Sequence, residues 1–452
     1  MESLRELYRI GPGPSSSHTL APQRACKMYM EHYPNAIFFD VSLYGSLALT
    51  GVGHATDEII KKTFAPKMCR VAFKDKALGK FPNGLVIRGY NSLNNLEMEW
   101  TVYSLGGGSI DIDEEDLKLH NEIYPHNYMY EILNYCHQNK ISIAEYSYRY
   151  EKDIDRYLSD VLNQMLKTVD HGLNASGILP GKLKLSRIAK ALHLQAISID
   201  DSIERQKILL SSYAYAACEE NADGKVCVAA PTMGASGILA ALVYYYYHDF
   251  GLSRSKLLHG LAVAGIFGNI VKKNATISGA VGGCQAEVGT ACAMGSAMIA
   301  YFNGLSNKLI AYAAEIGMEH HLCLTCDPVG GYVMIPCIER NAVATLRAID
   351  SAILAQHVGM IKANRVSFDD VVRTMQYTGK KIAIELKETS LGGLATEIGL
   401  DENKMIDNAT MTNKPETKKD ILSTYRSSSL FADLDIDEDY IDEIDNKLNI
   451  KI

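Results

Sequence analysis

The spacing of apolar residues differs between the two ends of the chain. In residues 1–150, short stretches rich in β-branched, aromatic and alternating apolar residues predict strands. These stretches are Ala36–Tyr44, Arg70–Lys74, Leu85–Tyr90 and Leu96–Leu105. An amphipathic run from His18 to about Tyr33 has its apolar residues at helical spacing and predicts a helix. The last three stretches are expected to be antiparallel strands that end at the glycines 106–108. Strands and helices of this kind predict an α+β layer domain.

Beyond about residue 150 the pattern changes to one helix after another, without convincing strand alternation, up to about residue 395. We therefore expect an α+β N-terminal domain, an antiparallel sheet with helices, in residues 1–150. A mainly all-α domain is expected in residues 151–400, and an acidic C-terminal extension in residues 401–452. Within that extension, Asp433–Asp445 is strongly acidic and has Ile436, Tyr440 and Ile444 four residues apart. This spacing fits a short amphipathic helix and a disordered tail equally well.

Length, charge and cysteine content narrow the class of protein. A chain of 452 residues is long enough for two domains. Its net charge of −8 argues against nucleic acid or an anionic membrane as a partner. The first ten residues do not resemble a signal peptide, and the longest apolar run, Ile238–Tyr247, is too short to span a bilayer. Ten cysteines in such a chain indicate reduced thiols and therefore a cytoplasmic protein.

Three of these cysteines stand beside turn residues, in the sequences Gly-Gly-Cys284, Cys326-Asp-Pro and Pro-Cys337. Glycine and proline free the backbone from helix geometry, so that the three thiols can converge on one metal centre. Taken singly, each cysteine is better explained as a small buried residue. Their separations of 42 and 11 residues match none of the short zinc or ferredoxin spacings. Spacing alone therefore does not establish an iron–sulfur cluster.

Two polar segments of the N-terminal part are candidates for substrate chemistry. Ser15, Ser16 and Ser17 precede His18 and Thr19 at the start of the predicted helix. A helix start can bind a carboxylate, although serines there also act simply as caps. His54 lies in a glycine-rich turn, where an imidazole can act as a general base or lie on the surface.

Polar residues also precede the first of the three cysteines. Asn274 and Ser278 are expected to face the substrate or to orient the groups that bind it. Met233, in the small-residue segment Ala230–Gly237, offers no polar side chain for a hydrogen bond at its position.

The chain resembles the iron–sulfur-dependent L-serine dehydratases over roughly residues 1–400. The resemblance rests on motifs that occur in the family's order: GPSSSHT (13–19), LYGSLALTGVGHATD (43–57), GLNASGILPG (172–181), GGCQAEVG (282–289), TCDPVGG (325–331), PCIERN (336–341) and KETSLGGLA (387–395). It implies a [4Fe-4S] cluster held by Cys284, Cys326 and Cys337, with one iron free to bind substrate. It also implies that Ser15–Thr19 contact the substrate and that His54 removes its Cα proton.

The implied reaction is the dehydration and deamination of L-serine to pyruvate and ammonia, without pyridoxal phosphate, in a homodimer. Three alternatives are open: an iron–sulfur lyase for L-threonine or L-cysteine, a non-catalytic amino-acid sensor of the same fold, and a structural zinc protein. The intact cysteines and histidines disfavour the sensor, and zinc ordinarily takes four closely spaced ligands.

Overall fold

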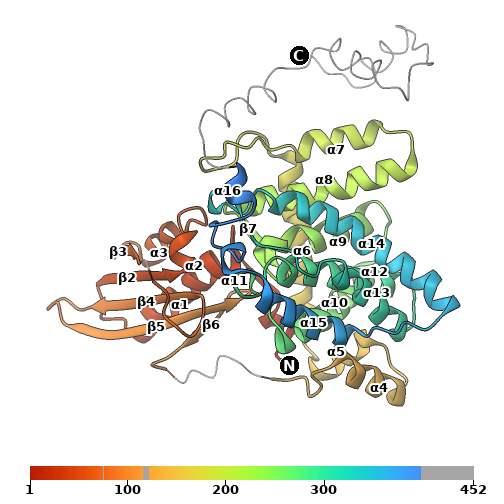
Figure 1. Ribbon diagram of the computed structural model, residues 1–452, viewed down its shortest axis with the longest axis horizontal. Coiled ribbons are helices and arrows are strands. Elements are labelled where there is room, and N and C mark those ends of the chain that lie inside the picture. Colours follow the sequence, from red (N-terminus) through yellow and green to blue (C-terminus); the bar gives the residue numbers. More distant parts are fainter. Residues whose placement is uncertain (75, 116–121, 399–452) are drawn as a thin grey trace, which may run out of the picture. The chain divides into compact units, whose positions relative to one another are not determined.

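The computed structural model describes residues 1–74, 76–115 and 122–398 (Figure 1). The acidic extension predicted for residues 401–452 lies outside the described residues. Within them, the N-terminal part holds a sheet with helices and the rest is largely helical, which confirms the predicted fold class. The domain boundary expected near residue 150 stays a prediction.

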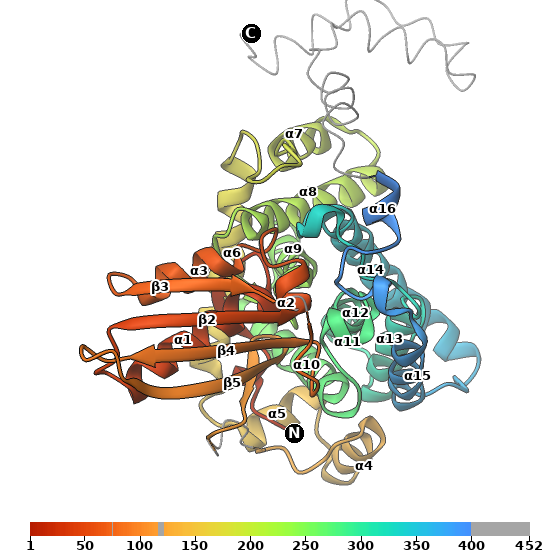
Figure 2. The ribbon, with the colours of Figure 1, turned by 60° about the vertical axis from the view of Figure 1, so that its left-hand side comes forward.

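A mixed five-stranded sheet with the order β3-β2-β4-β5-β6 forms the N-terminal layer (Figure 2). Its strands are β2 (Phe38–Gly45), β3 (Met68–Phe73), β4 (Asn83–Tyr90), β5 (Leu96–Gly106) and β6 (Ser109–Ile112). The predicted antiparallel pairing is correct for β4 and β5. It is wrong for β3, which runs parallel to β2 at the sheet edge. The reason is the connection, because the chain crosses back through helices between β2 and β3 and enters β3 in the original direction.

Two helices, α1 (Ala21–His32) and α3 (Thr56–Phe64), pack on one face of this sheet. Every second residue of β2, namely Phe39, Val41 and Leu43, is buried in that core. The short helix α2 (Ser46–Leu49) begins directly after β2. The turn into it requires Gly45, whose φ is +58° and whose added Cβ would lie 2.0 Å from the Pro82 carbonyl oxygen. This turn sets where the glycine-rich segment with His54 begins.

A second, two-stranded sheet joins the start of the chain to the helical part. Strand β1 (Arg9–Pro12) pairs antiparallel with β7 (Val226–Ala229). The residues just before β1 belong to the helical core, where Leu4, Leu7 and Tyr8 are fully buried. The Tyr8 hydroxyl donates to the Leu261 carbonyl at 2.8 Å. This sheet was not predicted, because strands of four residues are too short to show an alternating pattern.

The rest of the described chain is mainly helical and packs around one hydrophobic core. Its helices are α4 (Met129–Asn139), α5 (Ile143–Tyr150), α6 (Ile154–Asn174), α7 (Ala189–Ser198), α8 (Ser202–Ala222), α9 (Ser236–His248), α10 (Arg254–Asn274), α11 (Gly279–Gly282), α12 (Thr290–Phe302), α13 (Asn307–Glu319), α14 (Cys337–Ile361), α15 (Phe368–Lys381) and α16 (Leu394–Ile398). Helix α12 is buried on all sides from Thr290 to Ala300, as a helix that is apolar around its whole circumference must be. It contacts the helical turn Gln285–Gly289, which follows Cys284, and helix α14, which begins at Cys337.

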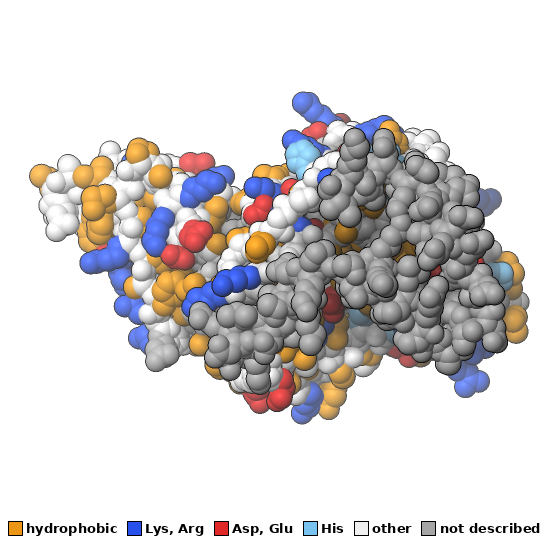
Figure 3. Space-filling view, turned by 90° about the horizontal axis from the view of Figure 1, so that it is seen from above, with side chains coloured by type: hydrophobic (Ala, Val, Ile, Leu, Met, Phe, Trp, Pro, Cys, Tyr) orange, Lys and Arg blue, Asp and Glu red, His pale blue; other side chains and the backbone are white. Residues whose placement is uncertain are grey.

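Two features of the described residues concern contacts with membranes and with polyanions: the apolarity of the helices and the distribution of surface charge. No helix among the described residues has the length and apolarity needed to cross a membrane. On the face shown in Figure 3, lysine and arginine side chains are interspersed with acidic and apolar ones. That face carries no single extended basic patch in its described part.

Candidate active site

Residues from both parts of the chain line one cavity. Its lining residues are Ser15, His54, Gly234, Cys284, Glu287, Val288, Cys326, Pro328, Val333, Cys337 and Glu388. They come from segments far apart in sequence that the fold brings together. All three predicted cysteines, His54 and the first predicted serine are therefore in the same place.

The three cysteines reach the cavity from a turn, an extended segment and a helix start. Cys284 follows Gly283, whose φ of +76° turns the chain between α11 and the next helical turn. Cys326 lies in an extended segment, and Cys337 is the first residue of α14. The sulfur atoms of Cys284 and Cys326 and a carboxylate oxygen of Glu287 lie within 4.8 Å of one another. These side chains are close enough to bind one metal centre.

The raised pKa values of two of these thiols, Cys326 and Cys337, indicate a site in which a bound cation would stabilise the thiolates. The pKa of Cys326 is raised well above its usual range by its contact with Cys284 and by burial. Burial and the nearby Cys284 also raise the pKa of Cys337 well above its usual range. Thiolates so placed repel one another and are poorly solvated, and a bound cation removes both penalties. The three sulfur donors, of which Cys284 and Cys326 are buried and Cys337 is half-buried, therefore suit a soft metal centre.

Glu287 is a site residue that the sequence reasoning missed. Burial and the neighbouring Glu388 raise the pKa of its carboxyl to about 8. The Cys326 thiol lies 3.9 Å from its Oε2. The only sequence signal for it was its position in the GGCQAEVG motif, three residues after Cys284.

His18 is fully buried and is held by hydroxyl groups. Its Nε2 lies 3.2 Å from the Ser46 Oγ and 3.0 Å from the Thr50 Oγ1. Both hydroxyls already donate to carbonyl oxygens, Ser46 to Glu388 and Thr50 to Ser46. We therefore assign the ring proton to Nε2, which leaves Nδ1 to accept from the Ser17 hydroxyl at 3.0 Å. Burial lowers the pKa of His18 to about 4, so the ring is neutral.

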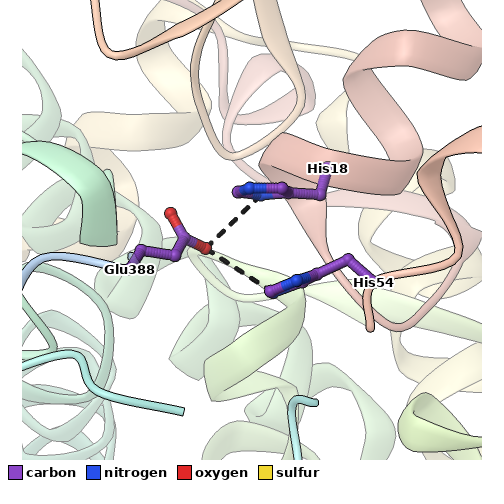
Figure 4. Close-up of side chains that lie close together, drawn as sticks. All are labelled: His18, His54 and Glu388. Carbon is purple, nitrogen blue, oxygen red and sulfur yellow. Dashed lines mark ion pairs between the residues drawn. The ribbon is translucent and has the colours of Figure 1, made fainter. Parts of the chain in front are cut away.

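His54 has the opposite tautomer. Its Nδ1 lies 2.9 Å from the Thr50 carbonyl oxygen, which can only accept, so Nδ1 carries the proton. The lone pair of Nε2 then points toward Glu388, 3.8 Å from its Oε1 (Figure 4). Burial, and next the adjacent His18, hold the pKa of His54 well below its usual range. His54 is 1% exposed, so the alternative of a surface histidine is wrong.

Glu388 connects the two histidines and was also missed. Its Oε1 lies 3.5 Å from the His18 Nδ1 and 3.8 Å from the His54 Nε2 (Figure 4). The two imidazole rings stack, with their centroids 4.2 Å apart. Burial raises the pKa of the Glu388 carboxyl to about 7. Because both facing nitrogens carry lone pairs, the protonated carboxyl can donate to either ring, whereas the ionised carboxylate can accept only from a ring that has taken up a proton.

Backbone hydrogen bonds join the segment that contains Glu388 to the segment that contains Cys326. Its N–H donates to the Cys326 carbonyl at 2.6 Å, and the Cys326 N–H donates to the Leu386 carbonyl at 2.8 Å. Glu388 has a φ of +57°, an uncommon conformation for a residue with a side chain. It turns the KETS segment at this point, and the pairing places the carboxylate beside the thiols.

The predicted serine segment forms a π-helical turn, Ser16–Leu20, before α1. Ser15 caps it by accepting from the His18 N–H at 3.1 Å. Ser16 accepts from the Met233 N–H at 2.7 Å, a bond that does not need the Met233 side chain. Thr19 donates to the His54 carbonyl at 3.0 Å and so joins the two segments. All five residues from Ser15 to Thr19 are buried, and Ser15 lines the cavity.

Asn274 and Ser278 are placed differently from each other. The Asn274 amide donates to the carbonyls of Asn127 and Ile270, and Asn274 is not among the residues that line the cavity. Ser278 is buried and its hydroxyl has no hydrogen-bond partner among the described residues. It precedes Gly279, whose added Cβ would lie 3.2 Å from the Cys326 sulfur. The structure therefore brings Ser278, and not Asn274, close to the cysteines.

Comparison with known proteins gives one consistent result. The family described as "Serine dehydratase alpha chain" matches residues 86–395, and the family "Serine dehydratase beta chain" matches residues 3–63. The chain is 37% identical to L-serine dehydratase 1 of Escherichia coli, in an alignment that covers 89% of this chain and 100% of the relative. It is 36% identical to an L-serine dehydratase of Streptomyces coelicolor, covering 88% of this chain and 99% of the relative. An L-serine dehydratase of Helicobacter pylori is 34% identical, with 87% and 98% covered.

Proposed function

This chain belongs to the serine dehydratase family, and we propose that it converts L-serine to pyruvate and ammonia. The observation that carries the proposal is the single cavity shared by three thiols, two carboxyl groups and His54. Loss of the serine hydroxyl needs an acidic group at oxygen and a base at Cα, and this cavity holds candidates for both. The aminoacrylate that is released tautomerises and hydrolyses to pyruvate and ammonia.

We propose that Cys284, Cys326 and Cys337 hold a [4Fe-4S] cluster. The support is the donor set, which consists of three thiols around one cavity with two of the sulfurs close together. Three cysteines leave one iron without a protein thiolate, and the cluster when bound supplies Lewis-acid assistance to departure of the hydroxyl. Nothing in this route calls for pyridoxal phosphate.

His54 is the proposed base for the Cα proton. The Thr50 carbonyl holds its Nδ1–H, so Nε2 has a free lone pair on the cavity side. Its neutral form at neutral pH is the form that a base requires. Glu388, at 3.8 Å, is in position to stabilise the imidazolium when His54 takes the proton.

The Ser15–Thr19 segment is the proposed binding element for the substrate. It offers hydroxyl and backbone N–H groups at the start of a helical turn, which suit the substrate carboxylate. Ser278 has a buried hydroxyl with no hydrogen-bond partner in the described part of the chain, and it suits the same task. The side chain of Asn274 is engaged with backbone carbonyls, and its part in substrate binding stays a prediction.

We further propose a cytoplasmic homodimer that binds neither nucleic acid nor membrane. All ten cysteines are free thiols, and this fits a reducing compartment. L-threonine and L-cysteine are the competing substrates, because both carry a leaving group on the β-carbon.

The test is anaerobic purification, iron and sulfide determination, and a pyruvate assay on L-serine. We expect about four irons and four sulfides per chain and turnover that is greater with L-serine than with L-threonine or L-cysteine. A protein that contains the cluster but forms no pyruvate would contradict the reaction, and an active protein without iron would contradict the cofactor.

A further inference from the structure

A second cavity, much larger than the first, lies beside the active site. Its volume is about 1120 Å³, enough for a small organic molecule. It is bounded by α2, the end of β3, the described residues between β3 and β4, helix α11, the end of α15 and the segment that follows α15. The part of the chain that carries the N-terminal sheet and the helical part thus form opposite walls.

The charged side chains among the described residues that line this cavity have one sign. Five lysines line it, namely Lys74, Lys76, Lys80, Lys380 and Lys387. None of the described lining residues is Asp or Glu, although the whole chain has a net charge of −8. Among the described residues, only Lys80 of the five has an ion pair, with Asp113. Four of the lining lysines therefore have no described counter-ion, and their charge favours an anion.

Apolar side chains also line the same cavity. Leu49, Phe73, Phe81, Val281 and Ile382 are among its lining residues. An inorganic anion would leave these side chains exposed to water, whereas an organic anion would cover them.

The cavity borders residues that hold the active site. Ser46 lines it, and the Ser46 hydroxyl contacts both His18 and the Glu388 carbonyl. Lys387 and Thr389, which also line it, flank Glu388 in the chain. The larger cavity is nevertheless lined by none of the residues that line the smaller one.

We propose that this lysine-lined cavity is a binding site for an organic anion, a carboxylate or phosphate ester with an apolar body, distinct from the site of the reaction. The lysines bind the charged group and the apolar lining residues bind the body. This proposal does not depend on the reaction that the other cavity performs.

Fluorescence titration of the holoenzyme with 8-anilinonaphthalene-1-sulfonate, an aromatic anion, tests it. We expect saturable binding that weakens at least about tenfold in the double variant Lys76→Glu/Lys380→Glu. Both lysines are exposed, so the variant should fold, and circular dichroism checks this. The matched control is Lys190→Glu on α7, an exposed lysine far from the cavity in sequence, which should bind as the unmodified protein does.

Competition experiments then test separately whether the ligand must carry a negative charge and whether it must have an apolar body. Octanoate should displace the probe at a lower concentration than 1-octanol, because only octanoate has the charge, and at a lower concentration than inorganic phosphate, because only octanoate has the apolar body. Equal displacement by phosphate would overturn the organic ligand, and equal displacement by octanol would overturn the anion. Binding that is unaffected by Lys76→Glu/Lys380→Glu, or no saturable binding, would overturn the site.

Discussion

At the scale of single residues, the two buried histidines differ in what holds them. His54 has its Nδ1–H fixed by a carbonyl and its Nε2 free, whereas both nitrogens of His18 are bonded to hydroxyl groups. One ring is therefore available to take a proton, and the other is suited to hold its neighbours in place.

Replacement of His54 tests its role as base. His54→Ala should lower kcat for L-serine by about 10²- to 10⁴-fold, because a positioned general base contributes about that much. The iron content should not change, since His54 is not a predicted ligand. The measurement is a pyruvate assay on protein with a verified iron count, and turnover within twofold of the unmodified enzyme would remove His54 from this role.

The low pKa of His18 makes stability depend on pH. The folded-state pKa is about 4, below the ordinary value of 6.5, so the unfolded chain binds this proton more readily. Stability from His18 is complete above pH 6.5 and is lost as pH falls toward 4, by about 3 kcal/mol. Glu388 acts in the opposite direction, because its raised pKa of about 7 favours the folded state at low pH.

A comparison of variants isolates the His18 contribution. Urea unfolding of metal-free protein should be measured between pH 7 and 4 for the unmodified chain and for His18→Asn. The difference in unfolding free energy between the two should shrink as pH falls, since the asparagine side chain does not titrate and Glu388 is common to both. A difference that stays constant over this range would contradict the low pKa.

At the scale of elements, the turn before α3 packs closely against the helical part and leaves no space for an added side chain. A Cβ added at Gly53 would lie 2.6 Å from the backbone carbon and oxygen of Gly331. Gly53 does not have a positive φ, so the constraint is the close approach of two backbones and not backbone strain. The contact fixes the position of the adjacent His54 relative to the loop that carries Cys326.

The substitution Gly53→Ala should therefore shift His54 away from its position beside the cysteines. We expect a loss of at least about tenfold in kcat/KM for L-serine, together with a destabilisation of about 1–3 kcal/mol, as overpacking ordinarily costs. The neighbouring Val52 is 68% exposed, and Val52→Ala should change neither quantity. Kinetics and thermal unfolding of both variants provide the measurement. Full activity in Gly53→Ala would show that the close contact does not position His54.

At the scale of the whole molecule, the cavity depends on segments that no short stretch of chain could bring together. The three cysteines are spread over residues 284–337, His54 belongs to the N-terminal layer, and Glu388 approaches from the end of the described chain. A metal centre bound by this set joins several elements, so its binding free energy adds to the stability of the folded state.

Removal of a single cysteine should therefore lower both the content of bound iron and the thermal stability of the protein. Cys326→Ala should lose most of the bound iron, and its Tm should fall by about 5 °C or more relative to the unmodified holoenzyme. The control is Cys323→Ala, three residues away, because Cys323 is exposed and does not line the cavity. Its iron content and Tm should match those of the unmodified protein. Equal iron in both variants would contradict the proposed ligand set.

The sequence by itself determined the class of fold and indicated several of the residues that line the smaller cavity. Local patterns were sufficient for the helical part, because a helix is specified by neighbours three and four residues apart. Motifs with glycine or proline beside Cys284, Cys326 and Cys337 indicated side chains in irregular backbone, and all three line the cavity. The segment Ser15–Thr19 and His54 were candidates from their positions at a predicted helix start and in a glycine-rich turn, and the family resemblance implied their roles.

Only the tertiary structure decided what depends on distant partners. The parallel pairing of β3 with β2 and the joining of β1 to β7 arise from connections and contacts that no local pattern encodes. Glu388 and Glu287 look like ordinary charged residues in the sequence, and they become site residues because folding brings them into the cavity wall beside the histidines and the thiols. Burial and proximity are what shift a pKa, and both are properties of the folded chain.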